Sequence, residues 1–338
     1  MKILIIGGTR FFGYHLTKKL IESGHEVALF NRGITPHDFG QRVEHIQGDR
    51  YDYQGFFGKL HRRKFDAVVD MVAFRAEDSR SAVRTFLSNI KHFIHISTAA
   101  VYVVAKDYPC PLQEKDFDRQ LYPQPKRNDE LWNYGYHKRK CEEVLREAYR
   151  KRVFPVTIFR LPIVIGERDY TLRAYSYFIR IKDKKPVILP DSGLNVFTHI
   201  YQGDVVKTIS SNLLNESAIG EAYNLAQEEI VTLRSFVIKA AEIMNKKVQI
   251  VDIPSRVLEN TPLGTSFSPF SMRRPFVLQT LKAREALNFT STPFDVWLKK
   301  TIHWFEEEYK GGPPDNYKLR NKEIEIVRKY QKAVTSIH

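Results

Sequence analysis

The N-terminal stretch, read as KILIIGGTRFFG from residue 2 to 13, constrains the fold more than any other part of the chain. Residues 3–6 form a continuous apolar run that stops at Gly7-Gly8, which is typical of a strand buried on both faces. From Phe12 to Leu20 apolar residues recur every four positions, and Gly24 ends this helical pattern. We therefore predict a buried strand, a tight glycine turn and an amphipathic helix in direct succession.

The glycines of this turn suit the binding of a dinucleotide. Gly7, Gly8 and Gly13 would let the backbone turn tightly, approach a pyrophosphate closely and pack the helix against the strand. The helix N-terminus would add N–H groups and a positive dipole for the phosphates. A tight turn without any ligand is the alternative. The predicted cofactor contacts include the whole turn: Gly7, Gly8, Thr9, Arg10, Phe11, Phe12 and Gly13.

The end of the next predicted strand, His25–Phe30, bears on the choice of cofactor. An acidic side chain here usually accepts hydrogen bonds from the adenosine ribose of NAD. The chain instead has Asn31, which is neutral, and Arg32, whose guanidinium suits a 2′-phosphate or the adenine ring. Arg10 would add a second positive group. The pattern favours NADP, with NAD as the alternative and a solvated turn residue as the alternative reading of Arg32.

Strand-like and helical stretches then alternate along the chain. Strands are predicted at Val43–Gln47, Ala67–Val72 and Phe93–Ile96, with a helix at Ser79–Asn89. Such alternation predicts an α/β fold with a Rossmann-type, doubly wound parallel sheet, whose ligands bind beyond the carboxyl ends of the strands. The remaining predicted cofactor contacts lie at these ends: Asp49, which would accept from the adenine amino group, and Arg50, Val72, Ala73, Phe74, Ser97, Leu161, Pro162 and Ile163.

Residues Val103–Trp132 lack clear periodicity and contain several prolines, which predicts a long loop over the site. A basic amphipathic helix at Tyr134–Lys151 and a strand at Val156–Phe159 follow. We predict three parts: a dinucleotide-binding domain at 1–160, a smaller C-terminal α/β substrate lobe at 161–312 with a segment at about 197–226 that returns to the main sheet, and a helical extension at 313–338.

Charge and cysteine content restrict the classes of function. The 338 residues carry a formal net charge of +14, which suits phosphorylated ligands or polyanions. Basic runs are also typical of solvated helix faces, so nucleic acid is the less favoured partner. Cys110 and Cys141 lack metal-ligand spacing, and we predict neither a metal site nor a disulfide. No apolar run is long enough to span a bilayer, and we expect no membrane association and a cytoplasmic protein.

A second group of residues supplies candidate chemistry. Thr98 follows a predicted strand, and Tyr134 lies four positions before Lys138, which places that pair on one helical face. The ammonium would stabilise a phenolate, so Tyr134 can exchange a proton with a substrate hydroxyl or carbonyl while a nicotinamide exchanges hydride. Thr98 would hold the same oxygen, and Lys138 would reach the nicotinamide ribose. An ordinary pair on a helix surface is the alternative for Tyr134 and Lys138.

A series of motifs runs through the chain in order: GGTRFFG at 7–13, GDRYD at 48–52, ISTAAVY at 96–102, YGYHK at 134–138, RLPIVIG at 160–166, FTHIYQGDV at 197–205, AYNLA at 222–226 and LKAREALNF at 281–289. Together they resemble the extended short-chain dehydrogenase/reductase superfamily, and more narrowly its NAD(P)-dependent epimerase/dehydratase group. The resemblance implies Thr98, Tyr134 and Lys138 as the catalytic residues, the glycines as the pyrophosphate loop, and a C-terminal lobe that binds substrate.

Two departures from this family pattern narrow the range of possible reactions and substrates. Members that dehydrate nucleotide sugars have an Asp-Glu pair where this chain has Ala99 and Ala100, which disfavours a 4,6-dehydratase because alanine cannot transfer protons. Many nucleotide-sugar members have an asparagine where this chain has Ile163, so the expected contact to a nucleotide diphosphate is missing. Other arginines would have to supply it: Arg173, Arg180, Arg273 or Arg274.

We expect an NAD(P)-dependent epimerase or reductase that acts on a hydroxyl or keto carbon of a sugar or nucleotide sugar, as a homodimer. An epimerase would return the hydride to the other face of the keto carbon and keep its cofactor, whereas a reductase would release the cofactor. The residues do not separate these outcomes. Two alternatives stay open: a basic RNA-binding protein, because the loop and charge resemble those of chloroplast stem-loop RNA-binding proteins, and a non-catalytic NADP-binding regulator.

Overall fold

The computed structural model describes residues 1–125, 129–152, 154–264, 268–270 and 275–336. The chain forms two compact units, and each unit is assembled from separate stretches of sequence. The first unit contains Met1–Val164, His199–Glu228 and Leu278–Ser291, and the second contains Ile165–Thr198, Glu229–Val277 and Thr292–His338. Along the sequence, the chain first passes from one unit to the other after Val164. We predicted a domain boundary after residue 160.

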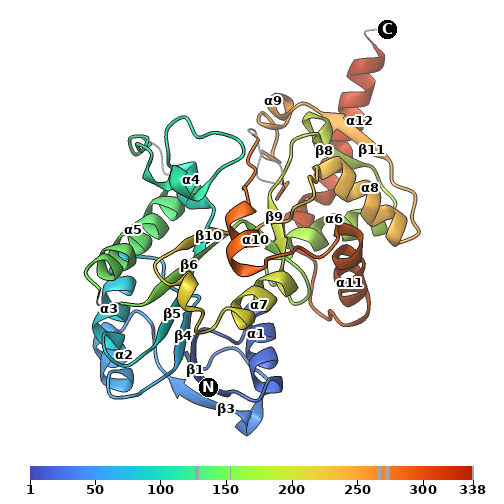
Figure 1. The fold of residues 1–338 in the computed structure, drawn as a ribbon. Helices are drawn as coiled ribbons and strands as arrows, with labels where there is room; N and C mark the ends of the chain where they lie inside the picture. The colour runs from blue at the N-terminus through green and yellow to red at the C-terminus, as the bar shows by residue number, and fades with distance from the viewer. Residues whose placement is uncertain (126–128, 153, 265–267, 271–274, 337–338) are drawn as a thin grey trace. The chain divides into compact units, whose positions relative to one another are not determined.

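A seven-stranded sheet forms the centre of the first unit (Figure 1). The strand order is β10-β6-β5-β4-β1-β2-β3, and all neighbouring strands pair in parallel. This result confirms the predicted doubly wound parallel sheet. The strands are β1 (Lys2–Ile6), β2 (Glu26–Asn31), β3 (Val43–Gln47), β4 (Ala67–Asp70), β5 (His92–Thr98), β6 (Val156–Leu161) and β10 (Ala222–Asn224).

Helices cover both faces of this sheet, which explains why its central strands are apolar runs without polar alternation. Ile3 and Ile5 pack into a core on the side of α1 and α7, whereas Leu4 and Ile6 pack into a second core on the side of α2, α3 and α5 (Figure 1). The helices are α1 (Phe11–Glu22), α2 (Tyr53–Leu60), α3 (Ala76–Phe86), α5 (Glu130–Arg150) and α7 (Gln202–Ser211).

The turn between β1 and α1 is packed too closely to admit a side chain at two of its glycines. Gly8 has a φ of +84°, and a Cβ placed there would lie 2.8 Å from Leu29 Cδ2. A Cβ on Gly13 would lie 3.0 Å from Met71 Sδ and 3.2 Å from the Cα of Gly8. Thr17 Oγ1 closes the turn by donating to the carbonyl oxygen of Gly8 at 2.8 Å. The helix therefore lies against the strand at the distance that glycine alone permits.

Later parts of the chain return to this unit. Residues 199–228 supply β9 (His199–Tyr201), α7 and β10, and β10 pairs with β6 at the edge of the main sheet. Residues 278–291 supply α10 (Leu281–Leu287), whose Ala283 and Leu287 enter the core beside α7. Between β6 and these segments the chain forms β7 (Ile163–Ile165).

The second unit is a smaller α/β assembly. Its two strands pair in parallel, and a set of helices packs around an aromatic cluster that includes Phe178, Phe236 and Phe270. Its elements are α6 (Arg173–Lys182), β8 (Val187–Pro190), α8 (Leu233–Ile243), β11 (Ile250–Ile253), α9 (Ser255–Leu258), α11 (Phe294–Glu307) and α12 (Arg320–Thr335). None of the described helices is long and apolar enough to cross a membrane.

Helix α12, which lies within the predicted C-terminal extension, belongs to this second unit. Val327 is 1% exposed and packs in a cluster with Ile188 of β8 and Val251 of β11. The carboxylate of Glu323 is fully buried between the guanidinium groups of Arg180 and Arg320. Apolar packing and paired buried charges together attach the extension to α6 and β8.

Several element boundaries differ from the sequence prediction for physical reasons. The strand predicted at Ala67–Val72 ends at Asp70, because the Asp70 carboxylate accepts the backbone N–H of Val72 and turns the chain. Helix α5 begins at Glu130 rather than Tyr134, because the side chain of Asp129 caps it by accepting from the N–H of Trp132. The predicted loop at Val103–Trp132 contains a short 3₁₀ helix at Glu114–Asp118, and its residues 126–128 lie outside the described part of the chain.

The contact between α1 and β1 predicts the effect of one added methyl group. Gly13→Ala should lower the free energy of unfolding by about 1–3 kcal/mol, because its Cβ would press on Met71 and Gly8. Gly58→Ala is the control, since its Cβ meets no atom within 4 Å in helix α2 and alanine favours a helix by up to about 1 kcal/mol. Urea unfolding followed by circular dichroism measures both. Equal stability of the two variants would contradict the close packing.

The buried charges on α12 predict a second effect on stability. Glu323→Gln should lower the free energy of unfolding of the second unit by about 3 kcal/mol or more, because it leaves the buried Arg180 guanidinium without a carboxylate and Arg320 with Asp183 alone. Glu325→Gln is the matched control on the same helix, where an exposed pair with Lys329 should contribute little. Calorimetric unfolding of both variants tests this. A Glu323→Gln protein as stable as the control would show that the buried Glu323 carboxylate does not stabilise the packing of α12.

Candidate functional site

The predicted site residues of the first unit lie at the carboxyl ends of the strands of its sheet. Because the strands are parallel, the chain leaves β1 at Gly7, β2 at Asn31, β4 at Asp70 and β5 at Thr98 on the same side. The structure therefore brings together residues that are far apart in the sequence. These are the turn at 7–13, the segments 31–32, 49–50, 72–74 and 97–98, and the segment 161–163 after β6.

The glycine turn has a backbone conformation that requires glycine. Gly7 and Gly8 have φ values of +109° and +84°, and α1 starts three residues later at Phe11. Phe11 itself has a φ of +50°, which is unusual for a bulky residue and costs about 1–3 kcal/mol. Its ring is buried, with 7% exposure, so packing holds this conformation. The turn is thus a preformed cradle at a helix N-terminus, where anions bind well.

The polar atoms of Asn31 are occupied by protein groups. Its Nδ2 donates to the carbonyl oxygen of Gly7 at 3.2 Å, and its Oδ1 accepts from the N–H of Gly33 at 2.8 Å. Oδ1 also lies 2.9 Å from Nε2 of His45, which must then carry the proton. Gln47 Nε2 donates to the carbonyl oxygen of Arg32 at 3.1 Å. Two side chains of β3 therefore fix the backbone at the end of β2, and the Arg32 side chain is exposed.

The side chains of Thr98 and Tyr134 differ in their exposure. Thr98 is 9% exposed at the end of β5, and its Oγ1 accepts the N–H of Ala100 at 3.2 Å, which leaves its own proton to donate. Tyr134 on α5 is 40% exposed, and its ring centroid lies 6.2 Å from that of Phe74. The candidate acid/base is accessible, whereas the candidate hydrogen-bond donor is oriented by its own backbone.

Lys138 is almost fully buried one helical turn below Tyr134. Its Nζ donates to the carbonyl oxygens of Ala73 at 2.8 Å and Ile96 at 2.7 Å, which leaves the third N–H for another acceptor. Burial lowers the pKa of Lys138 below its ordinary value, while nearby Asp70, Asp78 and Glu142 oppose that shift. The ammonium is therefore held by the loop after β4 and by β5, rather than free on a helix surface.

A close approach between two helices sets the place of Tyr134. Helix α4 (Ala100–Val103) begins directly after Thr98 and Ala99, and α5 passes over it. A Cβ on Gly135 would lie 2.2 Å from the carbonyl oxygen of Ala100, so only glycine allows this approach. The neighbouring Tyr134 is thereby fixed relative to the end of β5 that carries Thr98.

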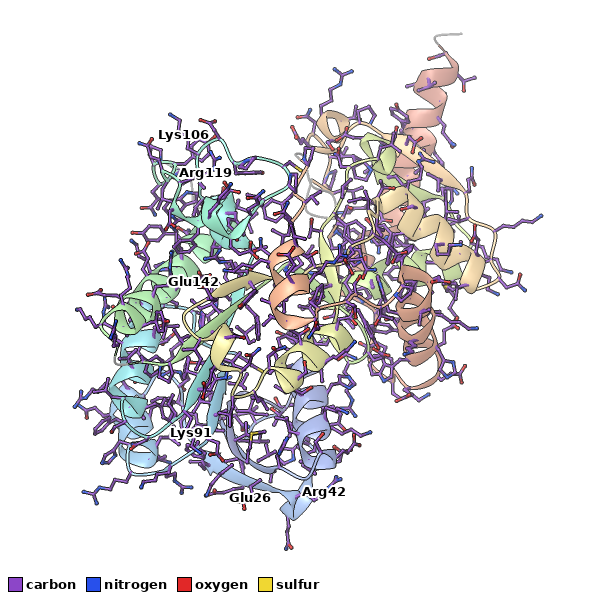
Figure 2. The ribbon with its side chains drawn as sticks, in the orientation of Figure 1. Glu26, Arg42, Lys91, Lys106, Arg119 and Glu142 are labelled. Carbon is purple, nitrogen blue, oxygen red and sulfur yellow. The ribbon has the colours of Figure 1, made fainter. Side chains whose placement is uncertain are left out.

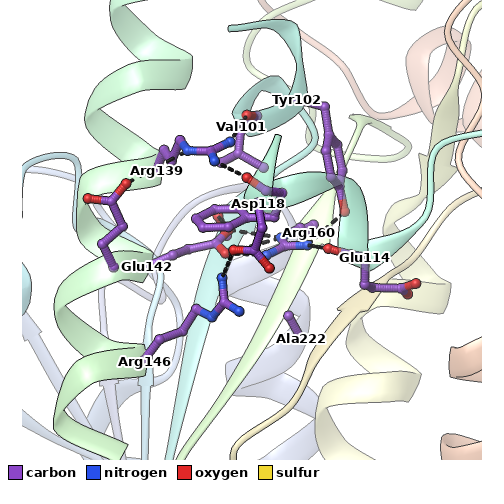
Figure 3. Close-up of polar contacts among 12 residues, drawn as sticks. Val101, Tyr102, Glu114, Asp118, Arg139, Glu142, Arg146, Arg160 and Ala222 are labelled. Atoms are coloured by element: carbon purple, nitrogen blue, oxygen red, sulfur yellow. Dashed lines mark hydrogen bonds and ion pairs between the residues drawn. The ribbon is translucent and has the colours of Figure 1, made fainter. Parts of the chain in front are cut away.

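The Arg160 guanidinium and the Glu142 carboxylate form a buried ion pair behind the site (Figure 3). Arg160 Nη2 lies 2.6 Å from Glu142 Oε2, and the two side chains are 1% and 0% exposed. Burial disfavours the charge on Arg160, but Glu142 and Tyr102 outweigh it and raise the pKa of Arg160. Ser97 Oγ donates to Glu142 Oε1 at 2.5 Å. The pair therefore joins β5, β6 and α5.

The same guanidinium ties the segment after α4 to the sheet. Arg160 Nη1 donates to Tyr102 Oη at 2.7 Å and to the carbonyl oxygen of Glu114 at 3.0 Å (Figure 3). Tyr102 Oη donates in turn to Asn224 Oδ1 of β10 at 2.7 Å. The ring of Phe117 is contacted by the guanidinium groups of Arg139, Arg160 and Arg146. These contacts attach the first part of the predicted loop, up to Phe117, to the sheet and to α5.

Figure 2 places Lys106 and Arg119 in this segment, whose two arms run side by side. The N–H of Lys106 donates to the carbonyl oxygen of Gln120 at 2.7 Å, and the N–H of Tyr122 donates to that of Val104 at 2.9 Å. Arg119 Nε pairs with Asp116 at 2.8 Å. The segment is thus a folded insert up to Tyr122, rather than one long irregular loop.

The side chains of two predicted cofactor contacts are bound within the protein, which leaves only their backbone groups for a ligand. Arg50 is 5% exposed and pairs with Asp70, so its guanidinium does not face a ligand. The hydroxyl of Ser97 is directed to Glu142 on α5. The other predicted contacts lie at or just beyond the strand ends. Asp49 is exposed, Ala73 is buried, Leu161 is the last residue of β6, and Pro162 and Ile163 follow it.

The arginines considered for a diphosphate differ in their surroundings. Arg180 is excluded, because its guanidinium is buried against Glu323. Arg173 is exposed at the first position of α6. Arg273 and Arg274 lie outside the described residues. Among the residues that the structure describes, no group of His, Cys, Asp and Glu side chains is arranged to hold a metal ion.

The sequence prediction missed residues that support the site from within. Glu142 lies four positions after Lys138 on the same helical face, a spacing that could have indicated a shared environment. Asp70 is an acidic residue at the end of an apolar run, which signals a buried polar role. His45 and Gln47 alternate with apolar residues on an edge strand, and nothing in the sequence indicated that they hold the end of β2.

Comparisons with known sequences agree with this arrangement. The model of the NAD dependent epimerase/dehydratase family matches residues 3–226. The chloroplast stem-loop binding protein of 41 kDa b from Arabidopsis thaliana is 29% identical over 245 residues, which are 68% of this chain and 60% of that protein. The N-acetyl-alpha-D-glucosaminyl-diphospho-ditrans,octacis-undecaprenol 4-epimerase of Escherichia coli O157:H7 is 26% identical over 269 residues, which are 75% of each chain.

The same fold occurs in solved structures of epimerases. The UDP-glucuronic acid 4-epimerase from Bacillus cereus, determined in complex with NAD, superposes with a TM-score of 0.69. It is 20% identical, and the match covers 92% of this chain and 99% of that one. The matching family model spans most of the first unit, from β1 to the segment after β10. The chain therefore belongs to the NAD-dependent epimerase/dehydratase family.

Proposed function

We propose that the protein is an NAD(P)-dependent epimerase or reductase that acts on a hydroxyl or keto carbon of a nucleotide sugar or related sugar diphosphate, with Tyr134 as acid/base. The observation that carries the proposal is the placement of the Tyr134 side chain, which is 40% exposed, one helical turn from the buried Lys138 ammonium on a helix that packs against Ala100, shortly after Thr98. The sugar-diphosphate 4-epimerase among the relatives supports the substrate class. A homodimer and a cytoplasmic location remain predictions.

The glycine turn fits a dinucleotide. Gly7 and Gly8 have positive φ values, and a side chain at Gly8 would collide with Leu29, so this tight turn before the N-terminus of α1 requires glycine. NAD(P) would be held by residues 7–13, by 31–32 at the adenosine end and by 72–74 with Lys138 at the nicotinamide end. When bound, it supplies a hydride acceptor or donor.

The side chains around Tyr134 suit proton exchange at a substrate oxygen. The third N–H of Lys138 provides a fixed positive charge that stabilises the phenolate form of Tyr134. Thr98 has its acceptor occupied by the N–H of Ala100, so its O–H can donate to the same substrate oxygen. Ala99 and Ala100, which are 2% and 8% exposed, offer no proton-transfer group, and a 4,6-dehydratase is disfavoured.

The end of β2 supports a preference for NADP over NAD. Both lone pairs of Asn31 Oδ1 are used by Gly33 and His45, so this atom cannot accept from a ribose hydroxyl. Arg32 follows with an exposed guanidinium, and Gln47 holds its backbone. A 2′-phosphate therefore meets a positive group, whereas the hydroxyls of NAD meet no acidic acceptor.

RNA binding is the second candidate. The observation that favours it is the 29% identity to a stem-loop binding protein, together with the net charge of +14. Such binding would depend on Lys and Arg contacts to phosphates, so its affinity would fall steeply with salt. It would not require the hydroxyl of Tyr134 or the ammonium of Lys138, which gives a direct way to separate the two functions.

The acid/base role predicts the outcome of removing one oxygen atom. Tyr134→Phe should lower kcat by about 100-fold or more, because no other group replaces the phenol, while dinucleotide affinity stays unchanged. Tyr136→Phe on the same helix is the matched control and should be active. The ring of Tyr136 stacks on that of Trp132, with 4.9 Å between the ring centroids. Turnover is measured on a panel of UDP-sugars by NMR of isomer interconversion and by loss of NADPH absorbance.

These assays separate the alternatives. Isomer interconversion without net NADPH loss identifies an epimerase, and stoichiometric NADPH loss identifies a reductase. Full activity of Tyr134→Phe would contradict its role as acid/base. Salt-dependent binding of stem-loop RNA that survives this substitution, with no turnover by the unmodified protein, would favour the RNA-binding candidate. Tight NADPH binding with neither activity would indicate a non-catalytic regulator.

The cofactor preference is testable by charge removal at Arg32. Arg32→Ala should raise the Kd for NADPH about tenfold and leave the Kd for NADH nearly unchanged, because the lost charge faces only the 2′-phosphate. Arg42→Ala, whose guanidinium donates to the carbonyl oxygens of Asp38 and Phe39, is the control. Quenching of protein fluorescence by each cofactor provides the Kd values. Equal losses for both cofactors would contradict a 2′-phosphate contact.

A further inference from the structure

A buried polar cluster lies beneath the loop that follows β4. Arg50 is at its centre, with its guanidinium 4.1 Å from the ring of Phe56. Its Nη2 donates to Asp70 Oδ2 at 3.2 Å and to the carbonyl oxygen of Asp78 at 2.5 Å. The side chains of Asp70 and Asp78 are fully buried. This cluster connects the segment after β3, the end of β4 and the start of α3.

The two carboxylates of this cluster hold the backbone of the loop. Asp70 Oδ1 accepts the N–H of Val72 at 3.0 Å. Asp78 Oδ2 accepts the N–H of Phe74 at 2.7 Å and that of Arg75 at 2.9 Å. Charge-assisted hydrogen bonds to carboxylates are stronger than those between neutral groups. The conformation of residues 72–75 is therefore fixed from inside the protein.

A tyrosine completes the hydrogen bonds of Asp78. Tyr53 on α2 donates its hydroxyl to Asp78 Oδ1 at 3.0 Å. Burial and this hydrogen bond raise the pKa of Tyr53 to about 12, so it stays a donor at neutral pH. Both oxygens of Asp78 thus have partners, one from α2 and the other from the loop.

The fixed loop in turn holds the candidate catalytic lysine. The carbonyl oxygen of Ala73, between the anchored N–H groups of Val72 and Phe74, accepts from Lys138 Nζ at 2.8 Å. The charged and polar groups near this ammonium come from several elements: Asp70 from β4, Asp78 from α3, His95 from β5, and Cys141 and Glu142 from α5. A shift of the loop would move one of the two carbonyl groups that hold Lys138.

The cluster is costly in terms of hydrogen bonding. Arg50 Nε and Nη1 and both ring nitrogens of His95 are buried without a hydrogen-bond partner among the described residues. Burial lowers the pKa of His95 well below its ordinary value, and Lys138 and Arg50 lower it further, so the ring is neutral. An apolar cluster of the same size would avoid these costs, which points to a role beyond stability.

We propose that Arg50, Asp78 and Tyr53 are positioning residues that set the place of the Lys138 ammonium through the backbone of residues 72–75. This inference rests on the proposed function of Lys138 and Tyr134. None of the three side chains needs to touch cofactor or substrate. They act through the Ala73 carbonyl oxygen, and so determine how strongly Lys138 favours ionisation of Tyr134 and how well it binds the nicotinamide ribose.

The test uses two substitutions in the full-length protein. Tyr53→Phe removes one hydroxyl, and Arg50→Lys keeps a positive charge but shortens the side chain by one bond, so its nitrogen no longer reaches both Asp70 and the Asp78 carbonyl oxygen as Nη2 does. Tyr51→Phe is the control, because Tyr51 is 51% exposed near the same cluster. Circular dichroism and unfolding midpoints first establish that each variant is folded.

Two measurements report on Lys138. The first is the ionisation pH of Tyr134, followed by NMR in protein with carbon-13 at the ζ position of tyrosine. The Tyr134 resonance is identified as the one absent from Tyr134→Phe. We expect it to ionise at higher pH in both variants, because a displaced ammonium stabilises the phenolate less. The second is the Kd for NADPH, which should rise about fivefold to tenfold through the weakened ribose contact.

The outcomes separate this inference from the proposed function. Folded Tyr53→Phe and Arg50→Lys proteins with the Tyr134 ionisation and NADPH affinity of the control would overturn the inference. If the unmodified protein binds no NADPH, the proposed function fails, but the Tyr134 titration still tests whether the cluster positions Lys138. If Arg50→Lys does not fold, the milder Tyr53→Phe decides alone. A loss of stability without a change in Tyr134 ionisation would show a purely structural role and would also overturn the inference.

Discussion

The buried ion pair between Arg160 and Glu142 is the interaction on which the rest of the first unit depends. Arg160 projects from β6, a strand with no exposed position, and Glu142 projects from α5, the helix that carries Tyr134 and Lys138. Removing either partner would leave an uncompensated charge in the protein interior. The pair therefore fixes the rotation of α5 and its position along the sheet. This places both candidate catalytic side chains near the carboxyl ends of the strands.

A recurring feature of this unit is that charges hold backbone rather than ligands. Arg160 donates to the carbonyl oxygen of Glu114, Arg139 donates to that of Val101, and Lys138 donates to those of Ala73 and Ile96. The bonds to Glu114, Val101 and Ala73 fix segments that leave the sheet, and the bond to Ile96 attaches Lys138 to β5 itself. The buried cations are matched by buried carboxylates, so their burial does not reduce the net charge of +14, which lies on the rest of the chain.

The sequence predicted the fold well because the relevant signals are local. Continuous apolar runs indicated strands covered on both faces, and the Gly7-Gly8 turn indicated the β1–α1 connection. The signals for the candidate catalytic residues were also local, since Thr98 follows a strand and Tyr134 precedes Lys138 by one helical turn. Sequence could not predict that Arg50 and Ser97 face inward, because that depends on partners 20 and 45 positions away.

The sequence by itself determined the order of strands and helices, the glycine turn and the spacing of the Tyr134–Lys138 pair, because each follows from the periodicity or backbone freedom of neighbouring residues. Only the tertiary structure decided the environment of each charge. Lys138 became a buried ammonium between two carbonyl groups, and Asn31 lost its free acceptor to His45. The physical reason is that desolvation and hydrogen bonding depend on groups brought together by the sheet, which adjacent residues do not specify.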